Sequence, residues 1–565
     1  MLRASQIAQI GLSVLLFTGL WSASIPSAAA SGQNNVQASS WDLPTRIIIK
    51  TESGSAFGQR SSASANLLRQ SVSTATHLPV QMGRKEGDLR FLTFDRRLSE
   101  AEVAQVIADV AGIPGVAAVE EDPIVTAAFV PNDPAYATDQ WYLRRDLLDP
   151  DTQEYSYGIN IEGAWELTQG DPNVVVAVLD SGYTDHPEFE NQILPGYNFA
   201  SYTASGAAGT DSDAHDLGNP AGNSSWHGTL VSGVIGATAN NSAGISGIAW
   251  QSKILPVRVL NDRNGYKSDI LAGIRWATGL PIDGIPTNPN PAQVINLSIA
   301  SLSPCDSNLI PLQETIDAAV ETGTIVVVAA GNKNTYASGY SPANCNNVIV
   351  VTGTNEVGGR WFSYSTVGSN YGANVDVSAP GTQIYTTSNT GDTAPSTAGY
   401  AFATGTSLST PQVAGVIALL LSLRPDLSTS DVEYILSQTA RPFPEGSECL
   451  TVGCGAGILD ASAAVRLASI KITQISSPTI FTNQNTPVQL SGSGFPLDAG
   501  VFIGGVLYPT QNNTSTSLDF TITAGSLPDG EYLIQICSNS GQQCSVAEAT
   551  RLSVESPVFL PVIAR

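Results

Sequence analysis

Five short apolar runs dominate the middle of the chain and are separated by stretches with helical periodicity; they lie at residues 174–179, 254–259, 294–298, 324–330 and 348–352. A strand that is apolar along its whole length must be covered on both faces, which is typical of parallel sheets. The helices that would supply this cover are expected at residues 227–237, 267–278, 312–322 and 410–423. The sequence therefore predicts an α/β domain at residues 140–468, with a mainly parallel sheet and helices on both faces.

The flanks of this domain follow other patterns. Residues 44–127 show the order strand, helix, strand, strand, helix, strand, which predicts a small ferredoxin-like α+β domain. Residues 128–139 are rich in turn formers and are interpreted as a linker and processing region. Residues 469–556 alternate in short runs between Gly, Asn and Pro-Asp-Gly turns, which predicts an all-β, Ig-like sandwich. The apolar tail at 557–565 is too short to span a bilayer.

The N-terminus and the composition indicate export. Arg3 precedes an apolar core at residues 10–21, and small residues at 27–30 offer a cleavage site, so residues 1–30 are predicted to be a signal peptide. The net charge of −24 argues against a nucleic-acid partner, and a low charged fraction of 13% is common outside the cell. We expect a secreted, extracellular monomer with no membrane span in its mature form and no organic cofactor.

All six cysteines lie after residue 300: Cys305, Cys345, Cys449, Cys454, Cys537 and Cys544. An even count behind a secretion signal predicts three disulfides, with free buried thiols as the alternative. Six cysteines allow 15 pairings. Pairing of the close neighbours, 449 with 454 and 537 with 544, would leave 305 with 345.

Ser407 lies in a Gly-flanked stretch, residues 405–411, directly before the apolar helical run at 413–423. The free N–H groups and the dipole at a helix N-terminus favour negative charge, which suits a nucleophile that builds an oxyanion. Taken alone, such a serine is more often a helix cap.

Three more polar residues end or follow apolar segments: Asp180, His227 and Asn332. At the carboxyl end of a strand, Asp180 could orient an imidazole. His227 could accept a hydroxyl proton near neutral pH, and the Asn332 amide could stabilise an oxyanion. Each residue by itself has an ordinary structural explanation in a turn or a helix start.

Together, the segments Val-Leu-Asp180-Ser-Gly, His227-Gly-Thr, Ala-Ala-Gly-Asn332 and Gly-Thr-Ser407 followed by Pro411 resemble the motifs of subtilisin-like serine proteases, peptidase family S8. The order Asp, His, Ser is that of subtilisin. The resemblance implies that Ser407 is the nucleophile, His227 the general base, Asp180 its orienting partner and Asn332 an oxyanion donor.

The resemblance also covers the flanks. Residues 44–127 resemble the inhibitor I9-type propeptide of such proteases, an intramolecular inhibitor that would be cut off near residues 127–131. Residues 469–556 are similar to an IPT/TIG-type domain, on Ser491-Gly-Ser-Gly-Phe495 and Asp529-Gly-Glu-Tyr532. The cysteines 305–345 and 449–454 look like those of secreted bacterial subtilases. The substrate-binding residues that it implies are Gly265, Tyr266, Ser298, Ile299, Ala300 and Gly331, where Ala300 replaces the family's Gly.

An acidic segment resembles a calcium-binding insertion of some secreted subtilases. Asp211, Asp213 and Asp216 are close enough in sequence to repel each other unless a hard cation lies between them. A structural calcium ion is therefore expected there, and a solvated acidic loop is the alternative.

These observations predict a secreted serine endopeptidase that hydrolyses protein or peptide substrates through an acyl-enzyme and is activated by propeptide autoprocessing. One rival is a non-catalytic binding protein on a dead protease scaffold, which the presence of all four residue types disfavours. Another is a hydrolase of non-protein substrates with the same triad, which the propeptide resemblance disfavours because self-cleavage requires peptidase activity.

The position after the nucleophile, usually Met in this family, is Leu408, and the only methionines are Met1 and Met82. Without its signal and propeptide the protein would contain no thioether to oxidise, so its activity should resist hydrogen peroxide. Peptide hydrolysis before and after peroxide treatment measures this, with Leu408→Met as the sensitive control. Rapid peroxide inactivation of the wild type would contradict the prediction.

Overall fold

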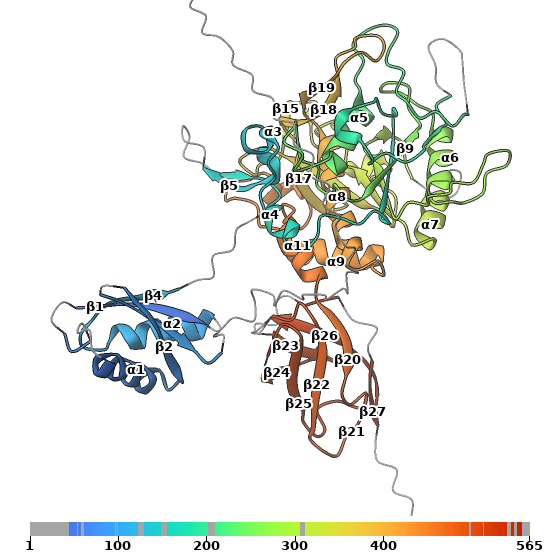
Figure 1. The fold of residues 1–565 in the computed structure, drawn as a ribbon. Helices are drawn as coiled ribbons and strands as arrows, with labels where there is room; N and C mark the ends of the chain where they lie inside the picture. Colours follow the sequence, from blue (N-terminus) through green and yellow to red (C-terminus); the bar gives the residue numbers. More distant parts are fainter. Residues whose placement is uncertain are drawn as a thin grey trace, which may run out of the picture. The chain divides into compact units, whose positions relative to one another are not determined.

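The computed structural model describes residues 45–555 except 53–54, 58–61, 87, 97, 99, 123–128, 149–154, 202–209, 306–310, 497–498, 512, 539–543 and 547–550 (Figure 1). The predicted signal peptide and the apolar tail lie outside the described residues, as does the start of the predicted processing region. The chain contains three parts with sheets of their own, which are taken here one by one.

The N-terminal part has the element order that the sequence predicts. Its elements are β1 (Arg46–Thr51), α1 (Ser62–Thr76), β2 (Val80–Glu86), β3 (Leu89–Phe94), α2 (Glu100–Ala111) and β4 (Val116–Glu121). The strands form an antiparallel sheet of order β2-β3-β1-β4. Ile47, Leu68, Leu92 and Val110 are buried in a hydrophobic core that contains no residue beyond Val119. This part therefore packs as a unit with its own core.

The central part is built on a seven-stranded sheet of order β17-β14-β12-β10-β7-β9-β8, in which all neighbouring strands are parallel. The five predicted apolar runs form β7 (Val175–Asp180), β9 (Lys253–Arg258), β10 (Val294–Leu297), β12 (Ile325–Ala329) and β14 (Ile349–Thr354). The two edge strands, β8 (Tyr197–Asn198) and β17 (Val377–Pro380), were not predicted. The mainly parallel α/β architecture is confirmed.

Helices cover both faces of this sheet, as the continuous apolar runs require. On one face, Val176 and Val178 of β7 share a core with α5 (His227–Gly236) and α8 (Thr406–Leu423). On the other face, Ala177 and Leu179 share a core with α6 (Lys267–Ala277) and α7 (Leu312–Glu321) (Figure 1). Alternate residues of one strand therefore point into two separate cores.

Helix α8 begins at Thr406, four residues before the predicted start at 410, so Ser407 lies inside its first turn and Pro411 inside the helix. Proline has no N–H with which to bond the carbonyl four residues earlier, that of Ser407. This carbonyl accepts a hydrogen bond from Ser298 Oγ at 2.9 Å instead. The hydroxyl of a neighbouring strand end thus satisfies the carbonyl that the proline leaves free.

Helix α8 is long and apolar enough to cross a membrane by length and composition, but 89% of it is buried inside the protein. It is therefore the core helix of the central part. The remaining elements of this part are short and are α3 (Pro134–Thr138), η2 (Trp141–Leu143), β5 (Arg145–Leu148), β6 (Tyr155–Tyr157), α4 (Glu162–Trp165), η3 (Pro187–Phe189), β11 (Ser301–Leu302), η4 (Ala337–Gly339), β13 (Tyr340–Ser341), β15 (Phe362–Tyr364), β16 (Val367–Gly368), β18 (Ile384–Asn389), β19 (Ala398–Ala403), α9 (Thr429–Thr439), α10 (Cys449–Val452) and α11 (Ala461–Ala468).

The C-terminal part is all-β, as predicted. Its strands are β20 (Lys471–Ile475), β21 (Thr479–Phe481), β22 (Thr486–Ser493), β23 (Ala499–Ile503), β24 (Val506–Gln511), β25 (Ser517–Ile522), β26 (Gly530–Ser538) and β27 (Arg551–Glu555), in the order β20-β22-β25-β24-β23-β26-β27-β21. Neighbours pair antiparallel except β21 and β27. Alternating residues such as Val488 and Leu490 fill its interior.

Because Ile417 of α8 is fully buried, Ile417→Ala should lower the free energy of unfolding by about 2–5 kcal/mol through lost contacts and the cavity it leaves. Thermal unfolding followed by circular dichroism, in a Ser407→Ala background that prevents self-digestion, measures the loss. The control is Leu302→Ala, a change at a residue that is 76% exposed and should cost no more than about 0.5 kcal/mol. Equal unfolding temperatures for the two variants would contradict the core assignment.

Candidate active site

The candidate residues gather at the carboxyl edge of the central sheet. Asp180 is the last residue of β7 and Ser298 follows β10, the parallel neighbour in which Asn296 pairs with Val178. Asn332 follows β12, the next strand along. The strand ends therefore bring residues that are far apart in sequence to one edge, where open α/β sheets bind ligands.

Asp180 and His227 are in direct contact. The Nδ1 atom of His227 lies 2.8 and 2.9 Å from the two carboxylate oxygens of Asp180. Asp180 is fully buried and also accepts a hydrogen bond from the N–H of Ser181 at 2.7 Å. A carboxylate in this position holds the imidazole so that Nδ1 donates and Nε2 is free to accept a proton.

The start of α5 holds the imidazole in place. Gly228 lies against Gly182, where a Cβ on Gly228 would come within 2.0 Å of the Gly182 carbonyl oxygen, so only glycine fits. The Gly228 N–H donates to Ser181 Oγ at 3.1 Å, and this hydroxyl donates to Asp216 at 2.6 Å. A buried Asp216 thus supports the turn that carries His227, a role that its place in an acidic segment did not reveal.

The electrostatics of the pair raise the pKa of His227. Burial by itself lowers the pKa of His227, but the charge of Asp180 and the hydrogen bond to it raise it, and the net effect is a raised pKa. The side chain is 22% exposed, so the ring still reaches solvent or a bound molecule. His227 can therefore accept a proton and hold it as a stabilised imidazolium.

Ser407 and Ser298 are joined by two hydrogen bonds, each from the hydroxyl of one residue to the carbonyl of the other. Its Oγ donates to the Ser298 carbonyl at 3.2 Å, while its own carbonyl accepts from Ser298 Oγ. Among the described residues no hydrogen bond joins Ser407 Oγ to His227, a contact that in unliganded active sites is often long and tightens on binding. The backbone N–H of Ser407 likewise has no acceptor within the described part of the chain.

Asn332 is oriented by Thr406, the residue before Ser407. Its Oδ1 accepts from the N–H of Thr406 at 2.9 Å and from Thr406 Oγ1 at 3.0 Å. With Oδ1 occupied, the amide nitrogen Nδ2 faces away and donates no hydrogen bond to any described residue. Nδ2 of Asn332 and the N–H of Ser407 are thus two unused donors, which is what an oxyanion needs.

Buried Asn370, which sequence reasoning missed, shapes the loop of Asn332. Its Nδ2 donates to the Ala330 carbonyl at 2.8 Å, and its Oδ1 accepts from the N–H of Lys333 at 2.8 Å. Its position between two turns is the one sequence signal for this role, and it is a weak signal because Asn is common in turns for local reasons. Asn370 therefore brackets Asn332 from both sides.

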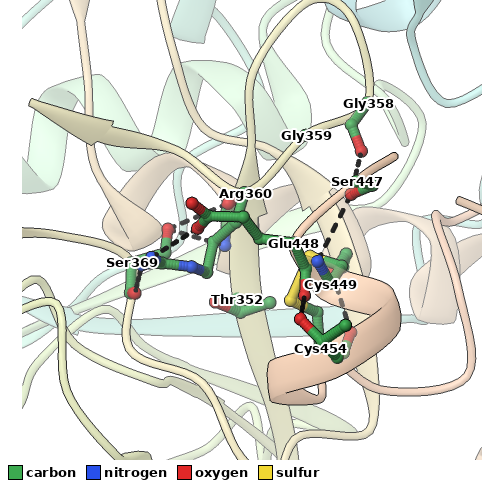
Figure 2. The surroundings of a disulfide bond; sticks show 12 residues. Thr352, Gly358, Gly359, Arg360, Ser369, Ser447, Glu448, Cys449 and Cys454 are labelled. Carbon is green, nitrogen blue, oxygen red and sulfur yellow. Dashed lines mark hydrogen bonds and ion pairs between the residues drawn. A yellow bond between two sulfur atoms is a disulfide. The ribbon is translucent and has the colours of Figure 1, made fainter. Parts of the chain in front are cut away.

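Arg360 links the same loop to a disulfide (Figure 2). Its guanidinium donates to Asn334 at 2.6 Å and to the Ser369 carbonyl at 2.8 Å, and it pairs with Glu448 at 2.9 Å. Glu448 directly precedes Cys449 of the Cys449–Cys454 bond. A half-exposed carboxylate beside the disulfide therefore anchors a buried arginine that holds the loop after Asn332.

All six cysteines are paired, as 305–345, 449–454 and 537–544. The disulfide interpretation is confirmed over free thiols. The pairing is the one that the short separations favoured.

Several of the residues implied in substrate binding lie close together. Gly265, Ile299 and Ala300 line one pocket. Tyr266 is 52% exposed beside it, and Gly331 adopts a φ of 101° with the Ala300 methyl close to its Cα. Their roles in binding stay predictions.

The three predicted calcium ligands do not converge. Asp211 accepts from the N–H of Asp213 at 3.0 Å, Asp213 accepts from the N–H of His215 at 3.0 Å, and Asp216 bonds Ser181. Across the described ranges, no group of three His, Cys, Asp or Glu side chains is arranged to hold a metal ion. As one set, these carboxylates do not fit a calcium ion, and no step below uses one.

Comparisons with known proteins bear on this arrangement. Residues 171–469 match the sequence model of the subtilase family, Peptidase_S8. An extracellular protease of Xanthomonas campestris pv. campestris is 41% identical over 435 residues, which is 73% of this chain and 71% of that protein. An extracellular basic protease of Dichelobacter nodosus is 36% identical over 390 residues, 65% of this chain and 61% of that protein. A solved protease structure from Pseudoalteromonas arctica PAMC 21717 is 41% identical, with a TM-score of 0.54, and covers 60% of this chain and 99% of that one.

Because the charge of Asp180 raises the pKa of His227, Asp180→Asn should lower it. NMR titration of the imidazole in a Ser407→Ala background measures the change. The matched control is Asp431→Asn, because this carboxylate caps α9 and is not among the groups that shift His227. A His227 pKa that is unchanged or raised in Asp180→Asn would contradict the electrostatic assignment.

Proposed function

The chain belongs to the subtilase family of serine proteases, and we propose that it is a secreted endopeptidase in which Ser407, His227 and Asp180 form the catalytic triad. The observation that carries the proposal is the contact of His227 Nδ1 with both oxygens of buried Asp180, at the sheet edge that also holds Ser407 and Asn332. The family membership rests on more than half of the chain.

In the proposed reaction, His227 Nε2 takes the proton of Ser407 Oγ as this oxygen attacks a peptide carbonyl carbon. Substrate binding exchanges the Ser298 carbonyl for His227 as the partner of Ser407 Oγ. The imidazolium then gives its proton to the leaving amine, and water, deprotonated by His227, clears the acyl-enzyme. Asp180 stabilises the imidazolium throughout, in keeping with the raised pKa of His227.

The negative charge that develops on the carbonyl oxygen would be held by Asn332 Nδ2 and the N–H of Ser407. Both donors lack other partners among the described residues, and both lie where α8 begins, so the helix dipole adds to them. Thr406 contributes indirectly, because its N–H and hydroxyl fix the amide of Asn332.

We further propose that residues 44–127 act as the propeptide and are released by self-cleavage near residues 127–131. Support comes from the separate core of the N-terminal part and from its strand order. The two relatives named above are described as extracellular, which together with the signal-like N-terminus supports secretion. The C-terminal β-domain is proposed to be of the IPT/TIG type, with a role in binding or in stability.

Expression of the wild type beside Ser407→Ala tests the triad and the processing together. The wild type should lose about the first 130 residues and hydrolyse casein, because the nucleophile that cuts the propeptide also cuts substrate. Ser407→Ala should stay full-length apart from its signal peptide and should be inactive. Intact mass spectrometry and casein hydrolysis are the measurements, and a folded wild type that is neither processed nor active would overturn the proposal.

A further inference from the structure

A pocket of about 250 Å³ is lined by Arg263, Asn264, Gly265 and Lys267 from one segment and by residues 299–301 from another. Its lining includes the apolar side chains of Leu260, Ile270, Leu297 and Leu312. Pockets that enclose a whole small molecule measure roughly 300–1,000 Å³. This one is smaller and opens between the two segments expected to bind substrate, so it is suited to a single side chain of a bound peptide.

Among the residues that the structure describes, the charged ones that line the pocket are Arg263 and Lys267. The carboxylates nearest to them in sequence are engaged elsewhere. Asp262 accepts from the N–H of Ser225 at 2.7 Å, and buried Asp269 accepts from the N–H of Ser201 at 2.8 Å. Among the described residues, neither cation forms an ion pair, and the Lys267 ammonium has only a hydrogen bond of 3.5 Å to Ser303.

The positive charge in this pocket is opposite in sign to the net charge of the chain. The chain as a whole carries a net charge of −24. Lys267 is moreover the first residue of α6, where a cation opposes the helix dipole. Helix stability therefore does not explain the lysine, and two cations in the lining of one pocket attract an anion.

The pocket also lies within electrostatic reach of the reaction centre. Burial lowers the pKa of His227 and Asp180 raises it. The charge of Arg263 also lowers the pKa of His227. Ser298, which joins the pocket residues Leu297 and Ile299, bonds Ser407 directly. A side chain in this pocket would thus belong to a residue close to the bond that is cut.

We propose that this pocket selects peptides with an acidic side chain near the scissile bond, with Arg263 and Lys267 as the specificity-determining residues. The inference rests on the proposed endopeptidase function. The apolar lining residues would pack against the methylenes of the side chain, which favours Glu over the shorter Asp, while Arg263 and Lys267 bind the carboxylate.

Internally quenched peptides test the selection, each of four positions on either side of the cleaved bond being varied among Glu, Gln, Leu and Lys. At one position, kcat/KM should be about fivefold higher for Glu than for the isosteric Gln, as for a partly exposed ion pair. The ratio should fall when NaCl is raised, because salt screens such a pair.

Charge variants identify the residues responsible. Arg263→Gln and Lys267→Gln should each reduce the ratio of kcat/KM for the Glu peptide to kcat/KM for the Gln peptide. When both residues are changed to Glu, the Lys peptide should be cleaved with a higher kcat/KM than the Glu peptide. Arg275→Gln is the matched control, because Arg275 lies near the other end of α6 and bonds the Pro281 carbonyl. Its ratio should equal that of the wild type.

Two results separate the inference from the function on which it rests. Cleavage by the wild type with equal rates for Glu and Gln at all positions, or a Leu preference alone, would overturn the inference and leave the endopeptidase function standing. A Glu preference that persists when Arg263 and Lys267 are both changed to Gln would also overturn it. If no peptide is cleaved by the processed wild type, the proposed function itself fails.

Discussion

The contact between His227 and Asp180 is the interaction on which the rest of the candidate site depends. A fully buried carboxylate is costly unless its charge is compensated and its oxygens are hydrogen-bonded. The imidazole and the N–H of Ser181 supply both here, and the fit of Gly228 against Gly182 brings the helix close enough for the contact. The same burial that makes the pair expensive also makes the carboxylate effective in raising the pKa of His227.

From this pair the arrangement extends through neighbouring strands to the nucleophile. Pro411 leaves the carbonyl of Ser407 without its helical partner, and Ser298, which follows the strand β10 beside the strand of Asp180, provides the replacement. The start of α8 is thereby tied to the strand edge that carries the acid–base pair. The pocket residues Leu297 and Ile299 flank Ser298 in the chain. Because charges farther apart than a Debye length of about 8 Å are largely screened, distant carboxylates have little effect on a side chain bound beside Arg263 and Lys267.

The sequence predicted the fold where single segments carry enough information. Apolar runs such as the one that ends at Asp180 located the five inner strands, and the cysteine separations anticipated the three disulfides. The sequence did not predict the edge strands β8 and β17, because they are too short for a periodic signal. The predicted start of α8 was four residues too late, because Pro411 is typical of the first turn of a helix. The sequence also did not reveal that Asp216 is buried and accepts a hydrogen bond from Ser181 Oγ, because this contact joins residues far apart in the chain.

By itself, the sequence determined which chemical groups are available, their order along the chain and the elements that carry them. These follow from local periodicity and from residue types. Only the tertiary structure decided which groups are free to react. The amide nitrogen of Asn332 remains available as a donor because Thr406 binds the amide oxygen. The cations at residues 263 and 267 form no ion pair among the described residues, and Asp262 and Asp269 instead accept hydrogen bonds from Ser225 and Ser201. Such hydrogen bonds join residues tens of positions apart, so strand register and packing, not local sequence, set them.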